Sequence, residues 1–275
     1  AEEAFAGTCG VAASFERFYH PLQDQDEEWV KDRDSTCNGE SSSMYNWNEG
    51  WENVRTVESH YQTLEWEVNR NPPAHDTKDA CLTLDTVIQI CETYRPHYHE
   101  MIVHYTARFI ENVKRVCFVG GGDSMLLHEI LKYPSLEKVV GLELDQQVVR
   151  GSFRHFGTQP HFDNDKVEWW FGDASKSLLM LPKEYFGSFD MIFVDLSESV
   201  TSASVTDELD IMQALTLLLA ADGIFLKNEV AYFSELKDIF PHTVHLSYDF
   251  VPVICLQSLI LGSKLVSFLS APLYD

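Results

Sequence analysis

Hydrophobic and polar residues follow two alternating patterns from residue 97 onward. Short apolar runs bounded by glycine or charged residues predict buried strands, and apolar residues three and four positions apart predict helices. The predicted strands are 115–121, 138–145, 167–174, 189–197, 223–230, 242–250 and 258–269. The predicted helices are 97–110, 124–133, 146–156, a short one after residue 174, 208–220 and 232–240. Strands that alternate with helices over short connections predict an α/β fold with a doubly wound sheet.

A different pattern precedes this region. Residues 1–50 are acidic, rich in Ser, Asn and Asp and weakly periodic, which is typical of an irregular arm. The segments 60–68 and 81–91 are rich in β-favouring residues and are separated by a break with Pro and Asn, so they predict a small antiparallel sheet. We therefore expect three parts: an arm over 1–50, a small antiparallel β-domain over 51–97 and a catalytic-type domain over 98–275.

Charge narrows the range of partners. The 275 residues include 43 acidic and 20 basic ones, which gives a formal net charge of -23. Such a charge repels nucleic acid and anionic membranes, and it favours small cationic molecules or basic proteins. No run of eighteen apolar residues is present, so we expect no membrane span. The chain begins with Ala rather than Met, which is compatible with a processed N-terminus and hence with the cytoplasm or an organelle, a plastid or a mitochondrion.

The six cysteines favour core packing or a disulfide over a metal site. No two of them form a CxxC pair, so a zinc site is not expected. Cys117 and Cys255 lie in apolar strand patterns. Two pairings remain open in an oxidising compartment: Cys9 with Cys37, and Cys81 with Cys91.

Acidic residues follow four successive predicted strands. These residues are Asp123 after the glycines of the first strand, Glu143, Asp173, and Asp195 with Glu198 close behind it. In doubly wound sheets, ligands bind at the carboxyl ends of the strands, where glycines permit a close backbone approach. The loop lacks the GxGxxG form and has no basic residue for a pyrophosphate. We therefore expect S-adenosylmethionine or a relative rather than NAD.

Three stretches carry a more specific signal. They are LDTVIQICETYRPHYHEMIVH, VKRVCFVGGGDSMLLHEILKYPSLEKVVGLELD, and the pair GDASKSLL and FDMIFVDLSE. In this order they resemble the spermidine synthase family of polyamine aminopropyltransferases, with a match that extends over about residues 51–265. The resemblance implies a Rossmann-like, S-adenosylmethionine-dependent methyltransferase fold with a small N-terminal β-domain. It further implies aminopropyl transfer from decarboxylated S-adenosylmethionine to a small cationic amine, no metal requirement, and a homodimer.

The resemblance also implies a role for each matching position. The implied cofactor-binding residues are Gln62, His99, Gly120, Gly122, Asp123, Glu143 and Asp173. Among them, Asp123 would hold the aminopropyl amine, Glu143 the ribose and Asp173 the adenine. Asp195 is implied to be the catalytic base, with Tyr98 and Glu198 on the substrate side. The chemistry is consistent with this role for Asp195. An amine is cationic and non-nucleophilic at neutral pH, so a carboxylate must take its proton.

Departures from the family pattern lie in the glycine loop and on the acceptor side. The family's Asp-Gly-Gly is here Asp123-Ser124-Met125, and its Gln-Gly-Glu is Lys227-Asn228-Glu229. Its Tyr-Pro-Ser-Gly stretch is replaced by the apolar segment 252–255. A lysine beside the amine pocket repels a cationic substrate unless its side chain points away.

Two hypotheses follow from these departures. The first is an aminopropyltransferase with a divergent acceptor pocket. The second is a catalytically inactive relative that acts as an accessory or scaffold subunit within a larger complex. An ordinary methyltransferase is disfavoured by the predicted β-domain. Met125 discriminates between the two hypotheses, since its side chain either packs into the core or occupies the space that a cofactor needs.

Overall fold

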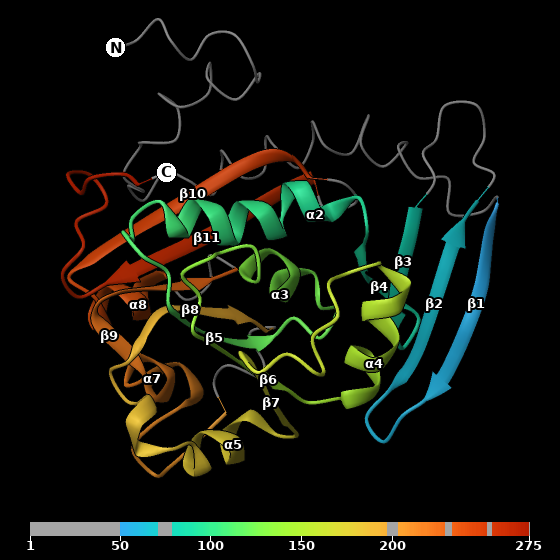
Figure 1. The fold of residues 1–275 in the computed structure, drawn as a ribbon, viewed down its shortest axis with the longest axis horizontal. Helices are drawn as coiled ribbons and strands as arrows, with labels where there is room; N and C mark the ends of the chain where they lie inside the picture. Colours follow the sequence, from blue (N-terminus) through green and yellow to red (C-terminus); the bar gives the residue numbers. More distant parts are fainter. Residues whose placement is uncertain (1–49, 71–78, 197–202, 229–232, 252–254, 275) are drawn as a thin grey trace, which may run out of the picture.

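The computed structural model describes residues 50–70, 79–196, 203–228, 233–251 and 255–274. Two sheets organise this part of the chain (Figure 1). One is four-stranded with the order β1-β2-β3-β4, and the other is seven-stranded with the order β10-β11-β9-β8-β5-β6-β7. Residues 1–49 of the predicted arm, together with Cys9 and Cys37, lie outside the described residues.

The small sheet is an antiparallel meander, as predicted. Its strands are β1 (Trp51–Glu58), β2 (Thr63–Asn69), β3 (Asp79–Leu84) and β4 (Val87–Cys91). Adjacent strands pair antiparallel throughout. β3 and β4 are joined by Asp85 and Thr86, whose φ angles of 46° and 70° give the left-handed turn that matches the twist of a two-residue hairpin.

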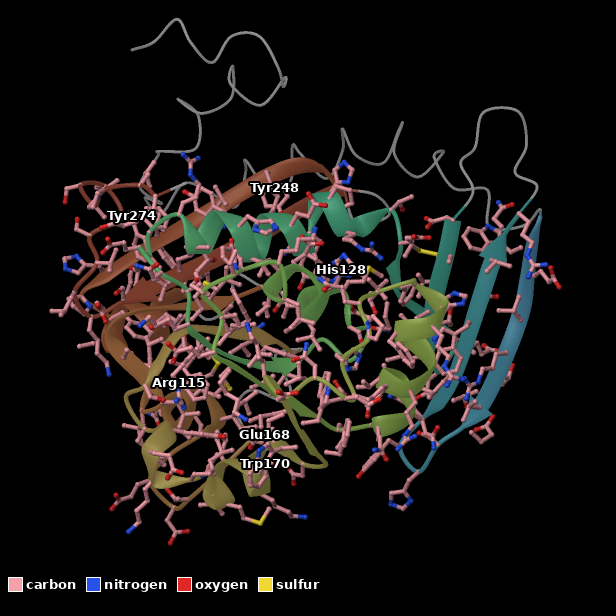
Figure 2. All side chains as sticks on the ribbon, in the orientation of Figure 1. Arg115, His128, Glu168, Trp170, Tyr248 and Tyr274 are labelled. Carbon is pink, nitrogen blue, oxygen red and sulfur yellow. A yellow bond between two sulfur atoms is a disulfide. The ribbon has the colours of Figure 1, made fainter. Side chains whose placement is uncertain are left out.

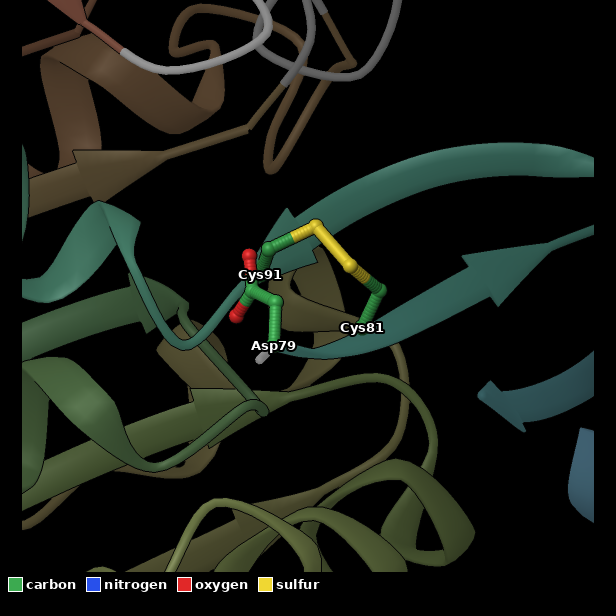
Figure 3. A group of neighbouring side chains, drawn as sticks. All are labelled: Asp79, Cys81 and Cys91. Carbon is green, nitrogen blue, oxygen red and sulfur yellow. A yellow bond between two sulfur atoms is a disulfide. The ribbon is translucent and has the colours of Figure 1, made fainter. Parts of the chain in front are cut away.

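A disulfide joins β3 to β4. Cys81 and Cys91 are directly opposite in the register and are bonded, so the second of the two open pairings forms (Figure 3). Asp79 lies beside them, but its carboxylate accepts hydrogen bonds from the Thr93 amide (3.2 Å) and the Thr93 hydroxyl (2.7 Å). This cluster therefore fastens the end of the sheet and offers no thiolate to a metal while the cysteines are oxidised.

The large sheet contains five parallel strands and an antiparallel pair at one edge. The parallel strands are β5 (Arg115–Gly120), β6 (Lys138–Glu143), β7 (Val167–Phe171), β8 (Phe189–Asp195) and β9 (Leu219–Lys227). β11 (Cys255–Ser263) pairs antiparallel with β9, and β10 (His242–Val251) pairs antiparallel with β11. The central strands β5, β6 and β8 are almost entirely buried, because helices cover both faces of a parallel sheet.

Short helices connect the strands. They are α2 (Tyr94–His97), α3 (Met125–Ile130), α4 (Gln146–His155), α5 (Ala174–Met180), the 3₁₀ turn η3 (Lys183–Tyr185), α7 (Ile211–Thr216) and α8 (Phe233–Ile239). The segment predicted as one helix over 97–110 contains a π-helical stretch, η2 (Met101–Tyr105). Tyr248 of β10 donates a hydrogen bond to the carbonyl of His97 (2.8 Å), which ties the end of α2 to the sheet edge (Figure 2).

The helix predicted over 208–220 is wrong in its second half. α7 ends at Thr216 and β9 already begins at Leu219, where it pairs with Phe189 of β8. The amides of Ser188 and Phe189 donate to the Leu218 carbonyl at 2.9 and 3.1 Å, which draws this apolar run into the sheet. A continuous apolar run does not distinguish a buried helix from a buried strand, so periodicity misplaced the boundary. The last strand also ends earlier than predicted, at Ser263.

The two sheets share one hydrophobic core. The indole of Trp66 on β2 packs against α4, where its Nε1 donates to the hydroxyl of Ser152 (3.3 Å). A Cβ at Gly151 would lie 2.0 Å from this indole, so glycine is what permits the contact. In the described part of the chain no helix is long and apolar enough to cross a bilayer. The junction fixes the small sheet beside the carboxyl ends of β6 and β7.

Candidate functional site

Two glycines bring the loop after β5 against the ends of its neighbours. Gly120 has a φ of +80°, and a Cβ there would lie 2.1 Å from the carbonyl oxygen of Asp195 at the end of β8. A Cβ at Gly122 would lie 2.8 Å from the carboxylate of Glu143 at the end of β6. The close approach of three strand ends thus depends on the absence of side chains at these positions.

The loop continues through Asp123, Ser124 and Met125, and Met125 faces the protein interior. The Met125 side chain is fully buried and packs in the hydrophobic core that the two sheets share. It therefore does not occupy the space beyond the carboxyl ends of the strands. Its amide donates to Oδ1 of Asp123 at 2.6 Å. Ser124 adopts a left-handed conformation with φ of 68° and is fully buried. The departure from the family's glycines is therefore accommodated by the backbone and the core.

Asp123 pairs with a buried histidine. His99 Nε2 lies 3.5 Å from Asp123 Oδ1, and the His99 side chain is fully buried. Burial alone would raise the pKa of Asp123, but His99 and the amide of Met125 outweigh it and lower the pKa below its ordinary value. Asp123 is thus held as a carboxylate that faces the interior of the site.

Asp195 is bound by a tyrosine and an amide. The Tyr98 hydroxyl donates to Asp195 Oδ1 at 2.6 Å, and Asn228 Nδ2 donates to the same oxygen at 2.6 Å. Asn228 Nδ2 also lies 2.9 Å from the Tyr98 oxygen. Burial raises the pKa of Asp195, and the charge of Asp123 raises it further, whereas the Tyr98 hydrogen bond, His99 and Lys227 lower it. The balance leaves a carboxyl group with increased proton affinity, as a general base requires.

Glu143 is another predicted acid whose pKa is perturbed. Burial raises its pKa to about 7, and the charges of Asp123, Asp145 and Asp195 add to the rise, against a hydrogen bond from the Asp145 amide. That amide donates to Glu143 Oε1 at 2.9 Å. The mutual effects of Glu143, Asp123 and Asp195 show that these three predicted acids converge at one edge of the sheet.

Asp173 and Gln62 make their contacts elsewhere, at the start of α5 and in the β1–β2 turn. Asp173 is exposed and is the N-cap of α5, where it accepts from the amide (2.9 Å) and the hydroxyl (2.7 Å) of Ser175. Gln62 makes the β1–β2 turn through its backbone, with its carbonyl accepting from the Ser59 amide at 3.0 Å. Neither residue belongs to the hydrogen-bonded group around Asp195 in the described structure.

A pocket of about 350 Å³ lies beside Leu144, the residue that follows Glu143. The hairpin between β1 and β2 forms one wall, and the ends of β6 and β7 form the other. The residues that line it are Glu58, Ser59, His60, Tyr61, Leu144, Asp145, Gln146, Gln147, Phe171 and Gly172. The structure therefore places the small sheet against the strand ends, with a cavity between them.

The sequence alone left open where Lys227 points. Its side chain is fully buried, and Nζ donates to the Leu196 carbonyl (2.8 Å) and to Asn228 Oδ1 (2.6 Å). The ammonium is therefore held in the wall of the site behind Asp195. The contact between Asn228 and Asp195 was missed from the sequence, although Asn228 follows the strand next to β8. Glu198, the other predicted substrate residue, lies outside the described residues.

Comparison with known proteins shows the family of this chain. A family model described as the spermine/spermidine synthase domain matches residues 95–256, which is more than half of the chain. The chain belongs to the spermine/spermidine synthase family. The polyamine aminopropyltransferase of Thermoanaerobacter pseudethanolicus is 37% identical over 173 residues, 59% of this chain and 61% of that enzyme. The matched segment thus spans about three fifths of that relative. The polyamine aminopropyltransferase of Hydrogenobaculum sp. is 28% identical over 228 residues, 79% of this chain and 74% of that enzyme.

Solved structures support the fold of this family member. Spermidine synthase from Thermotoga maritima superposes with a TM-score of 0.62 and 23% identity, over 77% of this chain and 72% of that chain. A spermidine synthase in complex with the transition-state analogue AdoDATO gives a TM-score of 0.61 at 23% identity. The predicted fold class, a Rossmann-like methyltransferase fold with a small N-terminal β-domain, is confirmed.

Proposed function

We propose that this protein transfers an aminopropyl group from decarboxylated S-adenosylmethionine to an amine acceptor. The observation that carries the proposal is the half-buried Asp195 carboxylate at the end of β8, which accepts a hydrogen bond from Tyr98 and is close enough to Asp123 for their charges to interact. Membership of the spermine/spermidine synthase family supports it, as do relatives named polyamine aminopropyltransferases.

On the donor side, carboxylates pair with the positive charges of the donor and accept hydrogen bonds from the hydroxyls of its ribose. We assign Asp123 to the aminopropyl ammonium, with His99 behind it, and Glu143 to the ribose hydroxyls. Gly120 and Gly122 let the donor approach the backbone. Asp173 and Gln62 are assigned to the two ends of the donor site, the adenine and the aminopropyl side. The 350 Å³ pocket beside Leu144 offers the space for the nucleoside.

On the acceptor side, Asp195 is the base. The neutral amine nitrogen attacks the carbon that is bonded to the sulfonium sulfur, the carbon–sulfur bond breaks, and its electron pair returns to sulfur. The new secondary ammonium group loses its proton to Asp195, either during or after the attack. Because the sulfonium is already a good leaving group, alignment by Tyr98 and Asp195 is the main catalytic requirement.

The test combines binding and turnover. Calorimetry should detect decarboxylated S-adenosylmethionine, and Asp195→Asn should reduce turnover by about 10²–10⁴-fold while donor affinity stays within a few-fold of wild type. Asp222→Asn is the matched control, because Asp222 is exposed near the start of β9. Unchanged turnover in Asp195→Asn removes Asp195 from this role. If neither the decarboxylated nor the intact donor binds, the chain is instead the non-catalytic accessory subunit, a function that its retention in a larger protein complex would support.

A further inference from the structure

Asn228 lies between strand β9 and the base. It directly follows β9, and its backbone amide donates to the Val194 carbonyl of β8 at 3.4 Å, so its position is tied to the strand that ends at Asp195. Lys227 Nζ donates to Asn228 Oδ1 at 2.6 Å. Because the oxygen of the side-chain amide faces the lysine, its nitrogen faces the other way, toward Asp195.

The Asn228 nitrogen joins Asp195 and Tyr98 into one closed group. Nδ2 lies 2.6 Å from Asp195 Oδ1 and 2.9 Å from the Tyr98 oxygen, and the Tyr98 hydroxyl donates to Asp195 Oδ1 at 2.6 Å. Burial and the charge of Asp195 raise the pKa of Tyr98 well above its ordinary value, so the hydroxyl keeps its proton and remains a donor. Tyr98 and Asp195 are 97 positions apart in the chain, and Asn228 contacts both of them.

The two donors determine which oxygen of Asp195 accepts a proton. Tyr98 and Asn228 both donate to Oδ1, and a carboxylate oxygen has about two lone pairs for such bonds, so the proton of an acceptor amine goes to Oδ2. Hydrogen bonds to the charged form of a carboxyl group also lower its pKa, against burial, which raises the pKa of Asp195. The titratable groups that act on Asp195 are Tyr98, His99, Asp123, Glu143 and Lys227.

We propose that Asn228 is a positioning residue: its amide nitrogen holds the Asp195 carboxyl group against the Tyr98 hydroxyl, so that Oδ2 receives the proton of the acceptor amine. The proposal rests on the proposed function. Asn228 acts through Asp195 and takes no proton itself, so its loss should affect the chemical step more than donor binding. Without Asn228 the carboxyl group loses one hydrogen bond to its charged form, and its pKa should rise.

The experiment removes the amide and follows both turnover and the pKa of Asp195. In Asn228→Ala, kcat should fall by about 10- to 100-fold, while the dissociation constant of decarboxylated S-adenosylmethionine from calorimetry stays within a few-fold of wild type. The rising limb of the pH profile of kcat/KM should move to higher pH, because the pKa of the base rises. NMR titration of the Asp195 carboxyl group, assigned by its absence in Asp195→Asn, measures the same rise without turnover.

Two further variants separate hydrogen-bond donation from packing. Asn228→Asp keeps the side-chain size and an acceptor oxygen, but it has no amide hydrogens and adds a negative charge. It should raise the pKa of Asp195 more than Asn228→Ala does, and it serves where the alanine variant does not fold. Asn53→Ala is the matched control and should change no readout, because Asn53 is exposed on β1 and its Nδ2 also bridges two side-chain oxygens, those of Thr56 and Glu65, both at 3.0 Å.

A double substitution tests whether Asn228 acts through the closed group. Tyr98→Phe removes the hydroxyl. The pair Tyr98→Phe with Asn228→Ala should lose less activity than the product of the two single losses, because either substitution alone already loosens the carboxyl group. Losses that multiply, together with an unchanged pH profile in Asn228→Ala, show a role in packing alone and overturn the inference.

The outcomes distinguish this inference from the proposed function. If the wild-type protein transfers the aminopropyl group, and folded Asn228→Ala and Asn228→Asp keep its kcat and its pH profile, the inference is wrong and the function stands. If the wild-type protein transfers nothing, the proposed function fails, and the NMR titration alone decides the inference. In that case, a pKa of Asp195 that is the same in wild type and in both variants overturns it, and a higher pKa in both variants supports it.

Discussion

Ser124 occupies a position that suits glycine better than serine. Its φ of 68° is left-handed, its side chain is fully buried, and its hydroxyl has no hydrogen-bond partner among the described residues. Although Ser124 is the N-cap of α3, its side chain makes no capping hydrogen bond. The Asp123 carboxylate binds the first helical amide instead. We therefore predict that Ser124→Gly stabilises the protein.

Three contributions set the size of the effect. A residue with a Cβ in the left-handed region costs about 1–2 kcal/mol relative to glycine. A buried hydroxyl without a partner costs about 1–3 kcal/mol. Against these, the greater freedom of glycine in the unfolded chain costs about 0.5–1 kcal/mol. Because removal of the hydroxymethyl group also leaves a small void, we expect a net gain of about 1–2 kcal/mol in the free energy of unfolding.

Urea unfolding followed by tryptophan fluorescence measures this gain as a higher midpoint at constant m-value. Ser124→Ala retains the left-handed Cβ and should show only the part of the gain that comes from loss of the hydroxyl. Ser177→Gly makes the same substitution at a buried position inside α5 and should destabilise by about 1 kcal/mol. A Ser124→Gly midpoint at or below that of wild type, with the m-value unchanged, refutes the reasoning.

Two further predictions concern pH and redox state. The pKa of Glu143 is raised from 4.5 to about 7, so the folded state binds the proton more tightly and loses stability as the pH rises through this window. Glu143→Gln should remove this loss, about 3 kcal/mol between about pH 4 and pH 8, and flatten the pH dependence of the urea midpoint; an equally steep dependence contradicts the assignment. Reduction of the Cys81–Cys91 disulfide, which closes a loop across 10 positions, should lower stability by about 3 kcal/mol in the chain-entropy model. Cys81→Ser with Cys91→Ser should then be insensitive to reductant, and a wild-type midpoint unaffected by reductant contradicts the prediction.

The fold could be predicted because each strand of the large sheet carries its own local signal. Apolar runs such as 115–121 and 189–197 end at glycine or aspartate, and β5 and β8 form there. The boundary between α7 and β9 could not be predicted, because residues 217–221 are apolar throughout and suit either element. The pairing of Leu219 with Phe189, a contact distant in sequence, decides it.

The candidate site was predicted as far as topology determines it. Parallel strands bring Asp123, Glu143 and Asp195 to one edge, and the resemblance supplied Tyr98, which the structure places on Asp195. Side-chain direction was not accessible from the sequence. Asp173 is largely used as a helix cap, and Lys227 points behind the base rather than into open space. Each of these outcomes depends on partners that are distant in the chain or on local capping geometry.

The departures from the family pattern therefore have unequal consequences. The Met125 side chain packs in the core, and Ser124 adopts a left-handed backbone conformation. The changes in the glycine loop therefore leave Asp123 paired with His99. The change on β9 is different in kind, because it buries a lysine behind Asp195 while Tyr98 and Asn228 still bind the Asp195 carboxyl group. A buried lysine costs desolvation energy unless partners compensate for it, and here the Leu196 carbonyl and Asn228 Oδ1 accept from its Nζ. The departure on β9 thus leaves Asp195 in place and hydrogen-bonded by Tyr98 and Asn228, which is what the proposed transfer requires of its base.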